Sequence, residues 1–187
     1  MIRILAISGS LRRFSSNTTL LQAAARLAPQ GVEITLYNGL AELPHFNPDL
    51  EGSEPATVVN FRARIKGSDG VLISSPEYAH GVPGALKNAL DWIVGSGELV
   101  DKPVALLNAS PRATFAQGSL TETIRVMSAH VVEEASLRIP LMGRNLDASG
   151  VAGDPELARL LATAIAEFRT AIENSHSNAK GMVESAV

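Results

Sequence analysis

The 187-residue sequence contains no cysteine. This absence excludes disulfides, thiolate metal sites and a cysteine nucleophile. The four histidines are not spaced like the ligands of a zinc motif, so we expect no metal centre. We also expect no catalytic side chain that acts as a nucleophile. Any redox chemistry would have to come from a bound cofactor.

The sequence also lacks an excess of basic charge and a long apolar run. Sixteen lysines and arginines stand against 19 aspartates and glutamates, a net charge of −3 with no basic stripe, so nucleic acid is not an expected partner. No apolar stretch is long enough to span a bilayer, and the apolar run at 2–7 is too short for a signal peptide. We expect a cytoplasmic protein that binds neither membrane nor nucleic acid.

Short apolar runs alternate with longer segments of helical period, which is typical of β-α-β units. Three runs are continuously apolar, which indicates strands that are covered on both faces, whereas two alternate, which indicates sheet edges. This pattern predicts an α/β fold with a doubly wound, five-stranded parallel sheet in the order 2-1-3-4-5 and helices on both faces. The predicted strands are residues 2–8, 32–37, 70–75, 104–109 and 131–139, the second and fifth being the edges.

Helical periodicity is clearest in residues 82–94, where apolar residues recur on one face. We expect one domain, residues 1–174, that closes with a packed helix after Asp154 and Pro155. Residues 175–187 have no apolar period and are expected to form a loose tail. The other predicted helices are 17–28, 57–66 and a weaker one at 118–127.

The segment that follows the first predicted strand, residues 9–17, is here called the first loop. It reads Gly-Ser-Leu-Arg-Arg-Phe-Ser-Ser-Asn and leads into a predicted helix, whose unpaired N–H groups and dipole favour a phosphate. It matches neither the P-loop pattern nor the dinucleotide fingerprint. Helix capping alone would also explain part of it. The candidate phosphate-binding residues are Ser10, Arg12, Ser15, Ser16 and Asn17.

The second loop, residues 76–84, follows the third predicted strand. Its two prolines restrict the backbone, and its glycines permit the backbone to approach a ligand closely. The loop could therefore lie against a flat aromatic ring and donate hydrogen bonds to it from backbone N–H groups. An ordinary stiff turn is the alternative. In the predicted strand order both loops, and the third loop at 108–112, meet at the carboxyl ends of the strands. The sequence contains no G-x-S-x-G elbow, so it does not support a serine hydrolase. The candidate ring-binding residues are Pro76, Glu77, Tyr78, Ala79 and Ser110.

Together the patterns G-S-L-R-x-x-S-x-N and P-E-Y-x-x-x-x-P-G-x-L-K-N-x-x-D-W resemble those of the NADPH-dependent FMN reductase family, which includes quinone, chromate and azo-dye reductases. The resemblance covers most of residues 2–170. It implies a flavodoxin-like fold, noncovalent FMN and a homodimer or homotetramer in which a neighbouring subunit roofs the site. The chain departs from the family pattern at Phe14, at Ala79 and over residues 112–116.

The function that the resemblance implies is an FMN-dependent NAD(P)H oxidoreductase. NADPH or NADH would supply electrons, which would pass through FMN to a small acceptor such as a quinone, an azo compound, a free flavin or a metal oxyanion. Two alternatives stay open. One is a flavodoxin-type electron carrier that acts on protein partners, and the other is a flavin-free module that holds a different phosphate.

Overall fold

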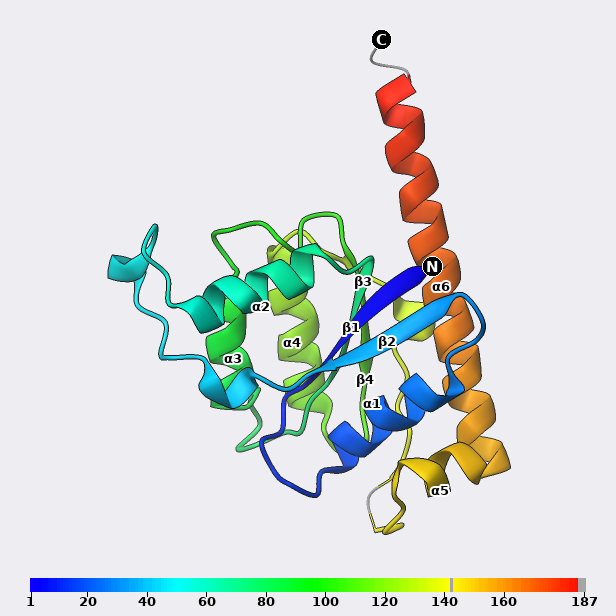
Figure 1. Cartoon of the computed structure of the whole chain (residues 1–187). Helices are drawn as coiled ribbons and strands as arrows, with labels where there is room; N and C mark the ends of the chain where they lie inside the picture. Colours follow the sequence, from blue (N-terminus) through cyan, green and yellow to red (C-terminus); the bar gives the residue numbers. More distant parts are fainter. Residues whose placement is uncertain (142, 185–187) are drawn as a thin grey trace.

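The structure, a computed structural model, describes residues 1–141 and 143–184, with side chains to residue 178 in the last helix. Its centre is a five-stranded parallel sheet in the order β2-β1-β3-β4-β5 (Figure 1). The predicted fold class and strand order are therefore confirmed. The strands are β1 (Ile2–Ser8), β2 (Val32–Tyr37), β3 (Gly70–Ser74), β4 (Pro103–Leu107) and β5 (His130–Val131).

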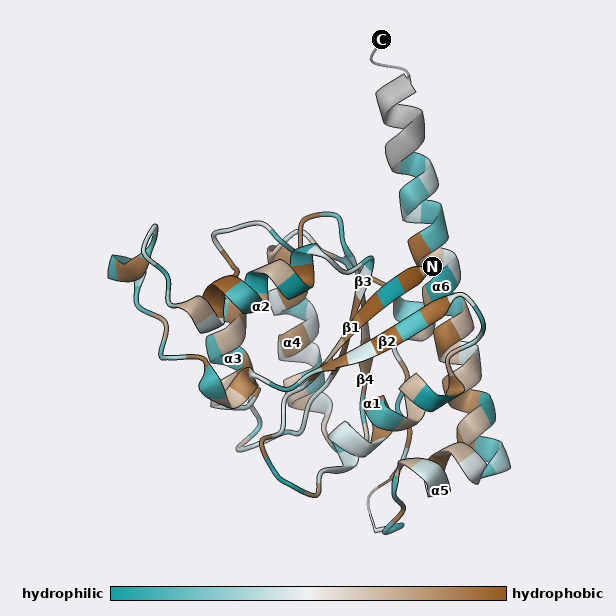
Figure 2. Cartoon of the chain, in the orientation of Figure 1, coloured by the Kyte–Doolittle hydropathy of each residue, from teal (hydrophilic) through white to brown (hydrophobic). Residues whose placement is uncertain are grey.

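Helices cover both faces of the sheet (Figure 1). In β1, Ile4 and Ala6 pack into the core on the side of α1, α5 and α6, whereas Leu5 and Ile7 pack into the core on the other side. All residues of β3 and β4 are buried, which confirms that these runs are central strands. Figure 2 shows β2 alternating in hydropathy, as expected of an edge strand. The helices are α1 (Ser16–Leu27), α2 (Ala56–Lys66), α3 (Gly84–Asp91), α4 (Thr114–Val126), α5 (Ala148–Gly153) and α6 (Pro155–Glu184).

The fifth strand is shorter than predicted. It covers His130–Val131 rather than residues 131–139, because the 3-10 helix η3 (Glu133–Ala135) interrupts the chain. At this interruption the Oγ of Ser136, not a backbone carbonyl, accepts the N–H of Leu106 at 3.0 Å. The alternating sequence pattern identified which side chains point inward but not this break in the backbone ladder.

Two helices also differ from the prediction at their ends. Helix α3 is confined to Gly84–Asp91, inside the predicted 82–94, because Pro83 is its N-cap and turns follow it. Helix α4 begins at Thr114 rather than near Gly118. This earlier start matters for the site, because it brings the first turn of α4 next to the second loop.

The last helix continues where a loose tail was predicted from residue 175. Helix α6 runs to Glu184 (Figure 1), and among its side chains up to residue 178 the last fully buried one is Ile172. A periodic pattern of apolar residues indicates where a helix packs against the core. A helix can extend beyond its packed part by adding one backbone hydrogen bond per residue, and the Arg169–Glu173 pair at 2.8 Å stabilises this part of the helix. Residues 185–187 of the predicted tail lie outside the described chain. No helix within the described ranges combines the length and apolarity needed to cross a membrane.

Candidate functional site

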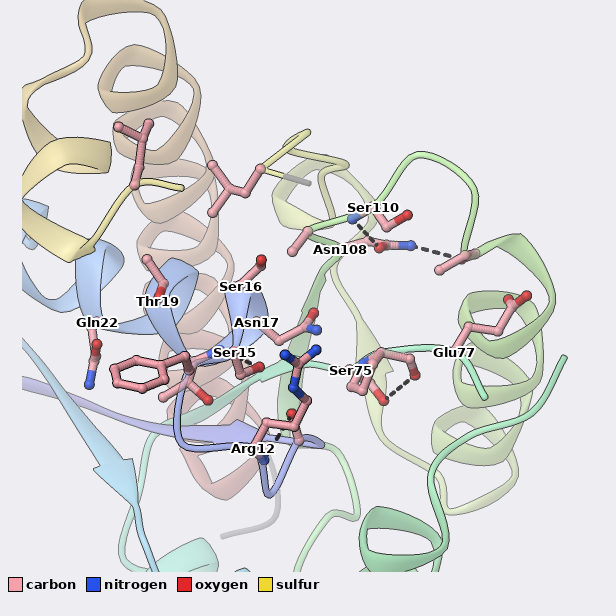
Figure 3. Close-up of a pocket in the computed structure, with 18 of the residues that line it drawn as sticks. Arg12, Ser15, Ser16, Asn17, Thr19, Gln22, Ser75, Glu77, Asn108 and Ser110 are labelled. Carbon is pink, nitrogen blue, oxygen red and sulfur yellow. Dashed lines mark hydrogen bonds between the residues drawn. The ribbon is translucent and has the colours of Figure 1, made fainter. Parts of the chain in front are cut away.

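A cavity of about 980 Å³ lies where β1, β3 and β4 end (Figure 3). The first, second and third loops all contribute to its lining, as the strand order requires. The structure thus brings together residues that are about 60 and 100 positions apart in the sequence. Of the predicted site residues, Ser10, Arg12, Ser15, Ser16, Asn17, Pro76, Glu77, Tyr78 and Ser110 line the cavity, whereas Ala79 does not.

The first loop is held against the end of β3 at Gly9. Its backbone N–H donates to the carbonyl of Ser74 at 2.8 Å. A Cβ at this position would lie 2.6 Å from Ser75 Oγ and 3.0 Å from Leu86 Cδ2. A glycine at this position therefore lets the first loop approach Ser75 and Leu86 closely.

Helix α1 begins at the cavity with a polar first turn. Ser15 is its N-cap, with its Oγ at 3.5 Å from the N–H of Thr18, and no acidic side chain occupies the first turn. The positive end of the helix dipole and the N–H groups of this turn are consequently available to an anion. Figure 3 shows Ser16 in this turn and Arg12 beside it.

Asn17 is oriented by a buried serine. The Oγ of Ser74, a fully buried residue, donates to Asn17 Oδ1 at 2.9 Å. An amide whose oxygen already accepts a hydrogen bond still has two N–H donors on its nitrogen. Because Asn17 also lines the cavity, its amide adds donors to the hydroxyl groups and the guanidinium of the first loop.

The second loop forms a tight hairpin, and this explains the position of Ala79. Tyr78 and Gly81 exchange two backbone hydrogen bonds at 3.1 and 2.9 Å, and the two residues between them, Ala79 and His80, have φ values of 49° and 59°. This is the geometry of a two-residue type I′ turn. Ala79 occupies the tip of the turn, away from the lining, and the His80 ring stacks on Phe115 with centroids 4.2 Å apart.

Glu77 lines the cavity but also has a structural contact that the sequence did not predict. Its Oε2 accepts the backbone N–H of Ala116 at 2.8 Å, in the first turn of α4. A carboxylate at a helix N-terminus is favourable, so this contact ties the second loop to α4.

The third loop is organised by Asn108, which is 1% exposed. Its Oδ1 accepts the N–H of Ser110 at 2.9 Å and its Nδ2 donates to the carbonyl of Ala113 at 2.8 Å. The turn that presents Ser110 and Arg112 to the cavity is therefore fixed from inside the protein.

Sequence reasoning missed one wall of the cavity, the segment that precedes and begins α5. The segment follows β5 by several residues and carries no motif, and it reaches the site only because α5 packs against α1. The one available signal was Asp147, whose Oδ1 accepts the N–H of Gly150 at 2.7 Å as the N-cap of α5. The lining residues from this segment are Leu141, Gly143, Asn145, Leu146, Asp147 and Ala148, and Gln22 of α1 was also missed.

The site fits a flat ring that carries one phosphate. Hydroxyl, amide, guanidinium and helix N–H donors converge at the end of β1, as a phosphate requires. The second loop, the third loop and the start of α5 form the remaining sides, and the cavity volume lies near the upper end of the range for small-molecule sites. Fold and site together define a flavodoxin-like protein with a site for a phosphorylated planar cofactor.

Comparison with known proteins identifies the family. Residues 2–141 match the NADPH-dependent FMN reductase family. An NAD(P)H-dependent FMN reductase from Pseudomonas aeruginosa is 34% identical over 166 residues, which cover 86% of this chain and 89% of that protein. A 2-hydroxy-1,4-benzoquinone reductase from a Burkholderia species is 32% identical over 155 residues, 80% of this chain and 84% of that one. The chain therefore belongs to the NADPH-dependent FMN reductase family.

A solved structure supports the same conclusion. The flavoenzyme FerB from Paracoccus denitrificans, an NAD(P)H:(acceptor) oxidoreductase, superimposes with a TM-score of 0.84 at 30% identity, covering 94% of this chain and 99% of that chain. The predicted family, the oxidoreductase class and the cofactors FMN and NAD(P)H are confirmed at the level of the family.

Proposed function

We propose that this protein binds FMN noncovalently in the cavity and uses NAD(P)H to reduce a small acceptor, with quinones as the first class to test. The observation that supports this most strongly is the donor cluster of the first loop, which faces a slot formed by the second and third loops. The relatives named as an FMN reductase and a benzoquinone reductase act on substrates of this kind.

In this proposal the chain's own residues bind and orient. Arg12, Ser15 and Asn17, with Ser10 and Ser16, hold the phosphate, and Pro76 to Tyr78 with Ser110 border the ring. When bound, FMN would supply the redox chemistry by accepting a hydride and passing electrons on. No side chain needs to act as a nucleophile, and the loops that would border the ring would exclude water from it.

The acceptor would enter past Tyr78, which lines the cavity and is 52% exposed. A half-exposed aromatic ring there favours flat, unsaturated acceptors over aliphatic ones. We therefore rank quinones first, then azo compounds and free flavins, with metal oxyanions last. Because NAD(P)H is supplied inside the cell, we place this activity in the cytoplasm.

We further propose that the protein works as a homodimer or homotetramer. Three large apolar side chains near the cavity, Phe14, Tyr78 and Phe115, are 79%, 52% and 58% exposed. Exposed apolar side chains that gather around a site favour burial by a partner, and a second copy of the chain would also cover the open side of the cavity.

The absorbance spectrum of the purified protein tests this proposal. We expect the bands of oxidised flavin, or their recovery on adding FMN, and rapid bleaching by NADPH with no partner protein present. A panel of quinones, azo dyes, free flavins and metal oxyanions then ranks the acceptors. A colourless protein that takes up no FMN would contradict the proposal, and bleaching that needs a protein partner would favour the electron carrier.

A further inference from the structure

Arg112 is presented to the cavity by a stiff turn. Its backbone N–H donates to Ser110 Oγ at 3.3 Å and its carbonyl accepts the N–H of Thr114 at 3.0 Å. The buried amide of Asn108 closes the same turn from below. The backbone that carries this guanidinium therefore loses little conformational freedom when a ligand binds, which favours affinity.

None of the salt bridges among the described residues includes the guanidinium of Arg112, although the side chain is exposed and lines the cavity. The two carboxylates of the described lining, Glu77 and Asp147, instead accept backbone N–H groups in the first turns of α4 and α5, at 2.8 and 2.7 Å. The positive charge of Arg112 is thus left for an anionic ligand.

The position of Arg112 separates it from the proposed FMN phosphate. The first loop follows β1 and the third loop follows β4, with β3 between these two strands. Neighbouring strands lie about 4.8 Å apart, so the two loops begin about 10 Å apart across the sheet. FMN carries a single phosphate, which the donors of the first loop account for, and Arg112 is carried by the third loop, on the other side of β3 from the first loop.

We propose that Arg112 binds a phosphate group of the nicotinamide dinucleotide and so helps to select the electron donor. This inference rests on the proposed function. A guanidinium matches a phosphate with two parallel hydrogen bonds, and the dinucleotide must approach the open side of the ring slot to deliver its hydride. Both donors contain a pyrophosphate, whereas only NADPH has a 2′-phosphate on its adenosine ribose.

The test compares Arg112→Gln with Arg159→Gln in the FMN-loaded protein. Arg159 is an exposed arginine of α6 that does not line the cavity. Calorimetry gives the dissociation constants of NADP⁺ and NAD⁺, which bind without reacting with oxidised flavin. We expect Arg112→Gln to raise the NADP⁺ constant about ten- to a hundredfold, as for loss of a charged hydrogen bond. Arg159→Gln should leave both constants unchanged.

The two ligands distinguish the two phosphate sources. If Arg112 binds the 2′-phosphate, only the NADP⁺ constant rises, and if it binds the pyrophosphate, both constants rise alike. Arg112→Lys should recover part of the affinity in either case, because it restores the charge without the planar fork. Unchanged constants for both ligands would overturn the inference.

The dissociation constant of FMN, measured by flavin fluorescence in the same variants, separates this inference from the proposed function. We expect Arg112→Gln to leave it unchanged. A rise equal to that for NADP⁺ would overturn the inference, because Arg112 would then hold FMN itself. A wild-type protein that binds no FMN would overturn the proposed function and the inference together.

Discussion

Two buried asparagines illustrate how single residues prepare the site. Asn108 uses both ends of its amide within its own turn, accepting from Ser110 and donating to Ala113. Asn17, which lines the cavity, uses only its oxygen, which accepts from Ser74, and its nitrogen donates to none of the described residues. The same residue type therefore has two roles: Asn108 fixes backbone, and Asn17 keeps donors for a ligand.

At this scale, Arg12→Ala should weaken FMN binding by about 1.5 to 3 kcal/mol, the contribution of a charged hydrogen bond. The fold should be retained, because Arg12 is exposed and lines the cavity rather than the core. Titration of flavin fluorescence gives the dissociation constant, and Arg26→Ala, on the exposed side of α1, serves as the control. An unchanged FMN constant in the Arg12 variant would contradict its role.

A second residue-scale prediction concerns Ser74. Ser74→Ala removes the hydroxyl that orients Asn17, so FMN binding should weaken by about 1 kcal/mol. The effect should depend on Asn17: once Asn17 is alanine, adding Ser74→Ala should cost little further affinity. A double-mutant cycle on the FMN dissociation constant measures this coupling. Additive losses would mean that Ser74 acts on the site by another route.

At the scale of elements, the site depends on contacts between segments that lie together at the carboxyl ends of the strands. Gly9 holds the first loop against β3, and Glu77 ties the second loop to α4. Stacking of His80 on Phe115 adds a second contact between these last two elements. The loops are consequently fixed to the strands and helices that carry them, which favours a preformed ring slot.

Gly9→Ala tests this arrangement. The added methyl group would overlap Ser75 Oγ and crowd Leu86, so the first loop must move away from the end of β3. We expect a loss of about 1 to 3 kcal/mol in unfolding free energy together with weaker FMN binding. Gly118→Ala is the matched control: it lies within α4 with no atom within 4 Å of the new Cβ, and should stabilise by about 0.5 to 1 kcal/mol. Denaturant unfolding curves compare the two, and a neutral Gly9 variant would show that the contact is not tight.

At the scale of the whole molecule, the exposed apolar side chains near the cavity bear on assembly. Phe115→Ser should shift the protein from dimers or tetramers towards monomers, as measured by analytical ultracentrifugation, because it removes apolar area from the proposed interface. Val126→Ser is the control on the same helix. Val126 is 70% exposed but is the last residue of α4, at the end of the helix that is far from the cavity. A wild-type protein that remains monomeric at high concentration would contradict the proposed assembly.

The outcome of the sequence predictions follows from how each feature is encoded. Strands β1 to β4 lie within two residues of their predicted bounds, because burial on one or both faces leaves a local apolar pattern. The first two loops could be located because each follows such a strand. The break in β5 depends on Ser136 bonding to a strand about 30 residues away, which no local pattern records.

The sequence by itself determined the α/β class and the two loops that carry the family's motifs, since these depend on neighbours along the chain. It also predicted the strand order, because continuous and alternating apolar runs distinguish central strands from edge strands. Only the tertiary structure decided that Ala79 lies outside the lining, that Glu77 contacts α4 and that the start of α5 forms a wall. Those features arise from contacts between segments that are distant in the sequence. Such contacts stabilise the fold but leave no periodic pattern in the sequence from which they could be predicted.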